Sequence, residues 1–343
     1  MAWQGIEGHD AVAEQFVRAA AHGRLAGAYL FVGPAGVGKA AFARALAKAL
    51  LCERPQPGLV ACGGCGSCVQ AAAGTHPDID LVEKPADRAT IPLEAFIGDA
   101  EHRMREGLCW RILLRPALGR RRVAIVLDAD HLSEEAANCL LKTLEEPPDT
   151  AVIILVGTAL ERQLPTIRSR CRIMRFRPLP TPTLLEILWR EQAASGERVA
   201  DDLLAAAAAA AGGSLVRARE LLDPELAAFR GRLAAILARR PLAGVELARE
   251  TITLVEAAGK DAAPRRARLR AVLGMAIELL RAALRTTGPG RAGAAAAFDI
   301  DAAVVALGQT LDALEAVDRN ANLTTLVDAW TAVVEEPRIA AGA

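Results

Sequence analysis

The chain has 343 residues, which is enough for two or three domains with sizeable cores. Its 41 basic and 41 acidic residues balance, which excludes a bulk field that would draw the whole molecule to DNA or to an anionic membrane. Residues Met1 to Gly5 show no basic region followed by an apolar run, so no secretion signal is expected. The odd count of seven cysteines then favours a reducing cytoplasm over a disulfide framework.

A glycine-rich loop near the N-terminus is the strongest functional signal. Residues 30–32 predict a short buried strand, and residues 41–51 predict a helix after the loop. Between them lie Gly33, Gly36, Gly38 and Lys39. Glycines can adopt backbone angles closed to other residues, which lets the loop N–H groups surround a phosphate that the lysine can also reach. The pattern Gly-x4-Gly-Lys-[Ser/Thr] therefore predicts a P-loop, and the alternative is a glycine turn with only a structural role. Because Ala40 lacks the hydroxyl that would hold Mg²⁺, binding of ATP and Mg²⁺ is expected to be weak.

Four cysteines follow the predicted helix in the pattern C-x9-C-x2-C-x2-C. They are Cys52, Cys62, Cys65 and Cys68. Two C-x2-C steps let four sulfurs converge on one centre, and small residues between them permit tight turns. Four thiolates that close a tetrahedron suit Zn²⁺ and leave no open position, so a structural site is predicted, with unligated or redox-active thiols as the alternative. The three remaining cysteines are expected to be small buried residues.

Two more strands are predicted where apolar runs end in polar residues. Residues 121–128 end in Asp128, and residues 151–156 are followed by Gly157 and Thr158. The carboxyl ends of parallel strands gather ligands, so Asp128 is expected beside the P-loop, where it could orient a magnesium-bound water. Thr158 could sense the γ-phosphate or could simply cap a loop.

The remainder of the chain is predicted to be mostly helical. Ser133 is expected to cap a helix that ends at Pro147, and a short helix over residues 164–171 carries two exposed arginines. Residues 177–180 resemble a proline linker. Beyond it we expect helices at 182–194 and 200–211, a third after Gly212–Ser214, and a bundle from residue 224 with breaks near 259–260 and 287–290. One helix is expected to pack along the face formed by Val304, Leu307, Leu311, Leu314 and Val317.

Several of these motifs together resemble one family. They are residues 28–31 before the P-loop, the four cysteines, His76-Pro77-Asp78, the run from Ala136 to Pro148, and Ser169-Arg170-Cys171. In this combination the chain resembles the delta-prime clamp-loader subunits of bacterial DNA polymerase III, which are AAA+ relatives of the gamma/tau subunits. The resemblance covers roughly residues 1–220 and is weak over the C-terminal third.

The resemblance implies an α/β AAA+ P-loop domain, a parallel sheet flanked by helices, over residues 1–177 with a zinc module at 52–68. A small helical lid domain at 178–222 and an all-α collar domain at 223–343 would follow. It further implies a hetero-oligomer with gamma/tau and delta subunits in the cytoplasm, which loads a sliding clamp on primed DNA during replication. The four cysteines would bind zinc. Arg170 would act in trans as an arginine finger on a neighbouring subunit's ATP.

The departures from the family's motor subunits concern hydrolysis. Those subunits carry Ser/Thr, Glu and Arg where this chain has Ala40, Ala129 and Val216, although Arg217 is adjacent to the last position. Asp130 could replace the missing Glu but is expected to point elsewhere. We therefore expect a subunit of the polymerase III holoenzyme without catalytic activity of its own. The alternatives are an active gamma/tau-like ATPase motor, in which Asp130 and Arg217 compensate, and another AAA+ remodeller. Four arginines could contact DNA, although a solvated surface is the simpler expectation. They are Arg115, Arg120, Arg121 and Arg122.

Overall fold

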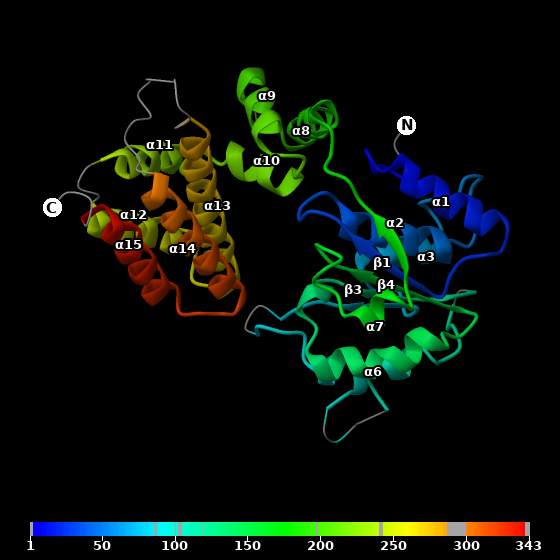
Figure 1. Ribbon diagram of the computed structural model, residues 1–343. Helices are drawn as coiled ribbons and strands as arrows, with labels where there is room; N and C mark the ends of the chain where they lie inside the picture. The colour runs from blue at the N-terminus through cyan, green and yellow to red at the C-terminus, as the bar shows by residue number, and fades with distance from the viewer. Residues whose placement is uncertain are drawn as a thin grey trace. The chain divides into compact units, whose positions relative to one another are not determined.

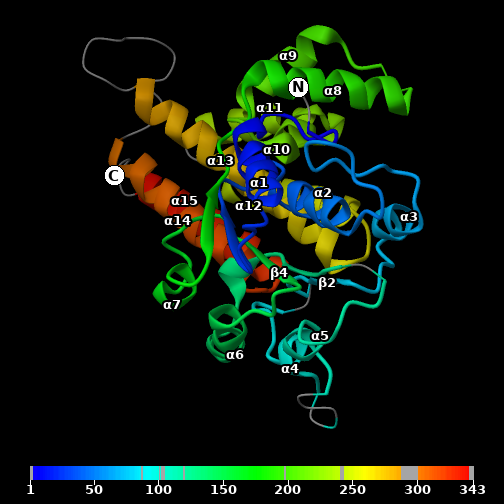
Figure 2. The same cartoon turned by 90° about the vertical axis from the view of Figure 1, so that its right-hand side faces the viewer.

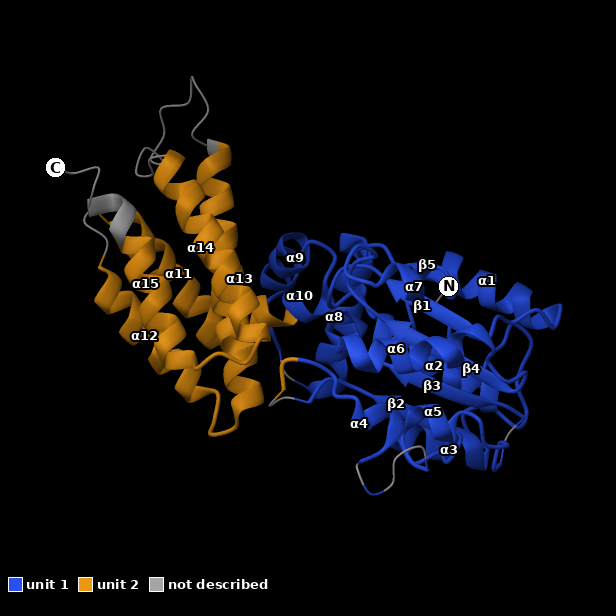
Figure 3. Ribbon diagram, turned by 60° about the horizontal axis from the view of Figure 1, so that its bottom comes forward, with its two compact units in different colours: residues 1–85, 90–218 blue, residues 86–89, 219–343 orange. Residues whose placement is uncertain are grey.

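The computed structural model describes residues 3–85, 88–99, 101, 105–118, 120–196, 198–239, 243–286 and 300–339, with the side chains of 286 and 336–339 excepted. Two compact units make up the chain (Figure 3). The first comprises residues 1–85 and 90–218, and the second comprises residues 86–89 and 219–343. Each unit has hydrophobic clusters of its own. The division of the chain into nucleotide-binding, lid and collar domains stays a prediction.

A five-stranded parallel sheet forms the centre of the first unit (Figure 1). Its strands are β1 (Ala28–Val32), β2 (Ile79–Val82), β3 (Arg122–Val126), β4 (Ala151–Val156) and β5 (Arg172–Arg175), in the spatial order β2-β3-β4-β1-β5. The three inner strands are buried along their whole length, as continuous apolar runs in a parallel sheet require. The ends of β1, β3 and β4 therefore meet at one edge, where such sheets bind ligands.

Helices cover both faces of this sheet (Figures 1 and 2). They are α1 (Asp10–Ala21), α2 (Lys39–Leu51), α3 (Gly66–Ala73), α4 (Glu94–Ile97), α5 (Leu108–Arg111), the 3-10 turn η1 (Ala129–His131), α6 (Glu134–Glu145) and α7 (Pro165–Arg168). Alternate residues of β1 face opposite sides. Tyr29 and Phe31 join the cluster with α1 and α2, whereas Leu30 and Val32 join the cluster with α4, α5 and α6. Ser133 caps α6 as predicted, because its hydroxyl accepts the N–H of Ala136.

Three helices follow the extended segment at 176–180. They are α8 (Thr181–Ser195), α9 (Asp201–Ala210) and α10 (Leu215–Leu222). Gly213 has φ +86°, and a Cβ at this residue would lie 2.4 Å from Pro178 Cβ. In addition, the N–H of Leu179 donates to Gly213 O at 3.0 Å. The proline-rich segment is thus packed against the turn before α10, and the predicted helices 182–194 and 200–211 are confirmed as α8 and α9.

In the described residues of the second unit the regular secondary structure is helical, as expected. Its helices are α11 (Pro224–Ala238), α12 (Gly244–Ala257), α13 (Ala262–Thr286), α14 (Ile300–Asp318) and α15 (Leu323–Ile339). The predicted break near residues 259–260 is confirmed between α12 and α13, and the predicted break at 287–290 lies outside the described residues. In the described part of the chain, no helix combines the length and the apolar character that crossing a membrane requires.

The predicted packing face of α14 was wrong in part. Val304 and Leu311 are 54% and 39% exposed. The buried residues of the helix are instead mainly small, namely Ala302, Ala303, Ala306, Thr310, Ala313 and Val317. In an alanine-rich helix both faces carry apolar residues at helical spacing. The larger aliphatic residues therefore did not identify the face that packs closely.

A candidate nucleotide site, a candidate finger arginine and a four-cysteine cluster

The predicted P-loop joins β1 to α2. Gly36 and Gly38 have φ angles of +76° and +101°, in the left-handed region that favours glycine. Gly36 also lacks space for a side chain, because a Cβ there would lie 2.2 Å from Ser214 Oγ. Gly38 is the N-cap of α2, so Lys39 is the first residue of the helix. The loop therefore has the strand–turn–helix geometry that the glycine pattern predicts.

The N–H groups of this loop are open. Within the described part of the chain, none of the N–H groups of residues 35–39 donates a hydrogen bond. The side chain of Lys39 bonds to carbonyl groups of the same loop, because its Nζ donates to Gly33 O and to Pro34 O at 2.6 Å each. Unpaired N–H groups at the start of a helix, next to a lysine, form an anion site. The geometry therefore suits a phosphate group.

Two other segments donate hydrogen bonds to carbonyl groups of the loop. The buried His9 ring donates from Nε2 to Val37 O at 2.7 Å, and it packs edge-on against Phe176. The N–H of Leu215, at the start of α10, donates to Gly36 O at 2.9 Å. Sequence reasoning missed His9, because a single histidine before a helix carries no motif. These contacts fix two carbonyl groups of the loop and leave its N–H groups without a partner among the described residues.

The residue at position 216 is part of this contact. A Cβ at Gly36 would lie 3.0 Å from Val216 Cβ, so the valine lies directly against the loop. An aliphatic side chain therefore stands where the family resemblance leads one to expect a guanidinium in motor subunits.

The carboxylate of Asp130 is hydrogen-bonded to residues that follow β4. Its Oδ2 accepts both the N–H and the hydroxyl of Thr158 at 2.6 Å, and its Oδ1 accepts the side-chain amide of Gln163. Burial lowers the pKa of Lys39 to about 8, and the nearby Asp130 carboxylate partly offsets this shift. With both oxygens engaged, Asp130 is poorly suited to activate a water.

Thr158 and Asp128 differ in their surroundings. The hydroxyl proton of Thr158 goes to Asp130, and its carbonyl accepts the N–H of Gly33 at 3.2 Å. These bonds favour the loop-capping alternative over a sensor of the γ-phosphate.

Asp128 has φ +54° and an exposed side chain, whose carboxylate accepts no hydrogen bond from any residue that the structure describes. Ala129 beside it is buried, at 4% exposure.

Arg170 lies just after α7, and its side chain is 31% exposed. Its Nε donates to Glu145 Oε1 at 2.8 Å, and its Nη1 donates to Thr166 O at 2.9 Å. The arginine is thus partly covered rather than fully exposed as predicted. The sequence did not single out Glu145, because 25 residues separate it from Arg170.

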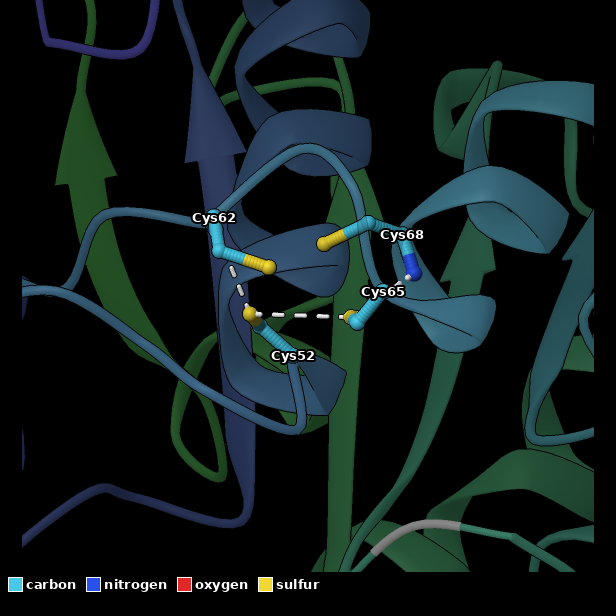
Figure 4. A group of neighbouring side chains, drawn as sticks. All are labelled: Cys52, Cys62, Cys65 and Cys68. Atoms are coloured by element: carbon cyan, nitrogen blue, oxygen red, sulfur yellow. Dashed lines mark hydrogen bonds between the residues drawn. The ribbon is translucent and has the colours of Figure 1, made fainter.

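The four predicted metal ligands come together in the structure (Figure 4). All four sulfurs lie within 4.8 Å of one another, and Cys52 Sγ is 3.9 Å from Cys65 Sγ. Zinc–sulfur bonds of about 2.3 Å give a tetrahedron with edges of about 3.8 Å, so the spacing fits. Hydrogen bonds from the N–H groups of Gly64 and Cys65 lower the pKa of Cys62 to about 6, whereas burial raises the pKa of Cys68 to about 12. Adjacent sulfurs cannot all ionise without a cation, and a divalent ion would remove this conflict.

A buried histidine links the cysteine cluster to the sheet. Ser67, next to the last cysteine, donates from Oγ to Leu51 O at 2.7 Å, and its Oγ lies 2.9 Å from His76 Nε2. The other ring nitrogen of His76 accepts the N–H of Asp78 at 3.0 Å. The ring is therefore neutral, with its proton on Nε2 pointing at Ser67. Through this contact His76 and Asp78 form one structural unit with the cysteine segment.

The predicted basic cluster is smaller than the sequence suggested. Arg122 is 6% exposed, because its Nη2 donates to Pro77 O at 3.0 Å and its Nε lies 3.4 Å from Asp80 Oδ2. A buried, paired guanidinium cannot contact DNA, so its inclusion in the cluster was wrong. Cys109 and Cys171 are buried and Cys139 is partly buried, as expected.

Comparison with known proteins agrees with this architecture. A family described as "DNA polymerase III, delta subunit" matches residues 8–180, just over half of the chain. The subunit delta' of Pseudomonas aeruginosa is 41% identical over 153 residues, which cover 45% of this chain and 43% of that protein. The subunit delta' of Escherichia coli is 36% identical over 182 residues, which cover 53% and 52%. The subunit gamma/tau of Mycobacterium tuberculosis is 37% identical over 205 residues, which cover 60% and 34%.

The matched region spans between about a third and a half of the length of these relatives. Among solved structures, a DNA polymerase III gamma subunit-related protein of Thermotoga maritima is 17% identical, with a TM-score of 0.40, over 95% of this chain and 99% of that chain. A likeness this distant supports no conclusion about function.

The parallel sheet, the P-loop and the helix start packed against that loop define the class of the first unit, which is an AAA+-like P-loop domain. The chain belongs to the DNA polymerase III delta subunit family, and the relatives named delta' and gamma/tau confirm the resemblance found in the sequence.

Proposed function

We propose that this chain is a delta-prime-like stator subunit of the polymerase III clamp loader. It would help to load a sliding clamp on primed DNA and would not hydrolyse ATP itself. The observation that carries the proposal is the contrast at the nucleotide site. The loop keeps a row of open N–H groups beside Lys39, whereas positions 40, 129 and 216 hold alanine, alanine and valine.

Each replaced residue removes a different contribution to hydrolysis. Ala40 offers no hydroxyl to Mg²⁺, Ala129 offers no base for the attacking water, and Val216 offers no charge to the γ-phosphate. Loss of one catalytic donor or base reduces rates by roughly 10²–10⁴. The three losses together predict almost no turnover, while binding of nucleotide phosphate remains open through Lys39 and through Gly33, Gly36 and Gly38.

Nucleotide binding and turnover by the isolated chain test this proposal. We expect binding that Lys39→Ala abolishes, with turnover at the background level in both proteins. The rival is a gamma/tau-like motor in which Asp130 and Arg217 compensate. Turnover at a motor-like rate that Lys39→Ala removes would establish the rival and refute the stator. The engagement of both Asp130 oxygens speaks against it.

We further propose that Arg170 acts in trans on ATP bound by a neighbouring gamma/tau-type subunit. A guanidinium neutralises charge that develops on the transferred phosphoryl group, and such fingers raise kcat by roughly 10³–10⁵ in GTPase systems. The test is Arg170→Ala in a complex assembled with gamma/tau-type and delta-type subunits. Loss of DNA-stimulated ATPase activity and of clamp loading is expected, and full activity would rule the role out. Such a complex would act in the cytoplasm.

Finally, we propose that the four-cysteine cluster holds one structural Zn²⁺. The converging sulfurs and the absence of an open ligand position support zinc rather than catalysis. Metal analysis of purified protein is expected to give about one zinc per chain, the capacity of one closed four-sulfur site. A metal-free protein with four reducible thiols and an unchanged fold would contradict the assignment.

A further inference from the structure

The guanidinium of Arg170 is held by its own chain on two sides. Glu145 Oε1 accepts from Nε at 2.8 Å and also from Nη2. On the other side, Nη1 donates to Thr166 O at 2.9 Å and to Ser169 Oγ at 3.2 Å. The carboxylate therefore covers one edge of the planar group, and the turn that carries the arginine contacts the opposite nitrogen.

This arrangement uses four of the five N–H donors of an arginine side chain. The remaining N–H belongs to Nη2, on the outer end of the guanidinium, and the contact of Nη1 with Ser169 is the longest of the set. The outer end is thus the part of the group that is most available to a further anion. Because two edges are fixed, the direction of this end is also fixed.

The carboxylate of Glu145 lies at the end of a helix where the helix dipole disfavours negative charge. Glu145 is the last residue of α6, and a carboxylate in the last turn of a helix faces the negative end of the helix dipole. The preceding residue, Leu144, is buried at 2% exposure and anchors this turn in the core. The Arg170 guanidinium supplies the compensating positive charge. The ion pair therefore accounts for an acidic residue at this position.

We propose that Glu145 is a positioning residue, which holds Arg170 in the orientation that reaches the ATP site of a neighbouring subunit. This inference rests on the proposed trans role of Arg170. A free arginine side chain samples many rotamers, and the carboxylate restricts it before the subunits meet. An arginine finger contributes mainly in the transition state, where charge develops on the phosphoryl group. Loss of its correct orientation should therefore lower kcat and leave the KM for ATP unchanged.

The test uses the assembled complex with gamma/tau-type and delta-type subunits. Glu145→Ala is expected to lower the DNA-stimulated kcat by about fivefold, the upper range for an exposed ion pair, with KM for ATP unchanged. Glu145→Gln keeps an oxygen that accepts from both nitrogens and is expected to lose only about twofold. Glu146→Ala is the matched control, because Glu146 is the adjacent exposed carboxylate and has no bond to Arg170.

A double-mutant cycle separates positioning from a general effect. In the Arg170→Ala background, Glu145→Ala is expected to cause no further loss. An equal loss in both backgrounds, a change confined to KM, or a Glu145→Ala complex with normal kcat would overturn the inference and leave the finger intact. If Arg170→Ala itself has normal activity, the finger role fails first, and the role of Glu145 fails with it.

Discussion

Replacing Asp130 with alanine distinguishes a structural role from a catalytic one. The change removes three hydrogen bonds at the end of β4, two from Thr158 and one from Gln163. Bonds to a charged acceptor contribute about 1.5–3 kcal/mol each, and water will recover part of this at a partly buried site. We therefore expect a loss of about 3–4 kcal/mol in the stability of the first unit. For a unit of this size the loss corresponds to a fall of about 10 °C in its melting temperature.

Differential scanning calorimetry measures this change, and Asp130→Asn refines it. The asparagine oxygen can still accept from Thr158. If the Gln163 amide rotates by half a turn, its oxygen can accept from the asparagine NH₂, so the third hydrogen bond forms with donor and acceptor exchanged. About a third of the loss is expected. Asp149→Ala is the control, since Asp149 is exposed and its carboxylate makes no hydrogen bond with any residue that the structure describes. An unchanged melting temperature in Asp130→Ala would refute the reasoning. Wild-type turnover that Asp130→Asn abolishes at constant stability would instead identify a catalytic base.

Three further predictions concern single residues. Burial lowers the pKa of Lys39 from 10.5 to about 8 in the folded chain. Between these pH values the unfolded chain binds more protons, so the stability of the nucleotide-free protein should increase as the pH rises from about 8 to 10.5. Calorimetry should find no such increase in Lys39→Met. Cys62→Ser should lose the proposed zinc in elemental analysis, whereas Cys139→Ser, outside the cluster, should retain it. Ala129→Glu should not restore turnover in an ATPase assay and should lower the melting temperature by several degrees, because position 129 is buried and an added carboxylate there loses hydration.

Local patterns predicted much of the fold and the site. The P-loop and the two buried strands that precede Asp128 and Gly157–Thr158 were predicted because each feature lies within a short run of the chain. The predicted strand 121–128 ends earlier, at Val126. The cysteine spacing likewise predicted a cluster, since only small residues separate its last three members. In these cases the residues near each other in sequence determine the geometry, so no knowledge of the tertiary fold was needed.

Features that depend on distant contacts were missed. The edge strands β2 and β5 are short and carry polar residues, so their sequences do not resemble the buried inner strands. The helix α3 begins inside the cysteine segment, where tight turns were expected. The pair of Glu145 with Arg170 and the network of Asp130 join residues 25 or more positions apart. The Asp130 network follows from the way the sheet brings the ends of β3 and β4 together, and the pair of Glu145 with Arg170 follows from the contact between α6 and α7.

The contacts of Asp130 link the candidate nucleotide site to the segment that leads to Arg170. Asp130 accepts hydrogen bonds from Thr158 and Gln163, and both residues lie in the segment that connects β4 to α7. Helix α7 in turn leads to Arg170. A carboxylate near the P-loop lysine therefore supports the segment that carries the proposed finger. On this basis the edge of the sheet has a structural task that does not require ATP hydrolysis, and such a task would favour retention of the P-loop in the non-hydrolysing subunit that we propose.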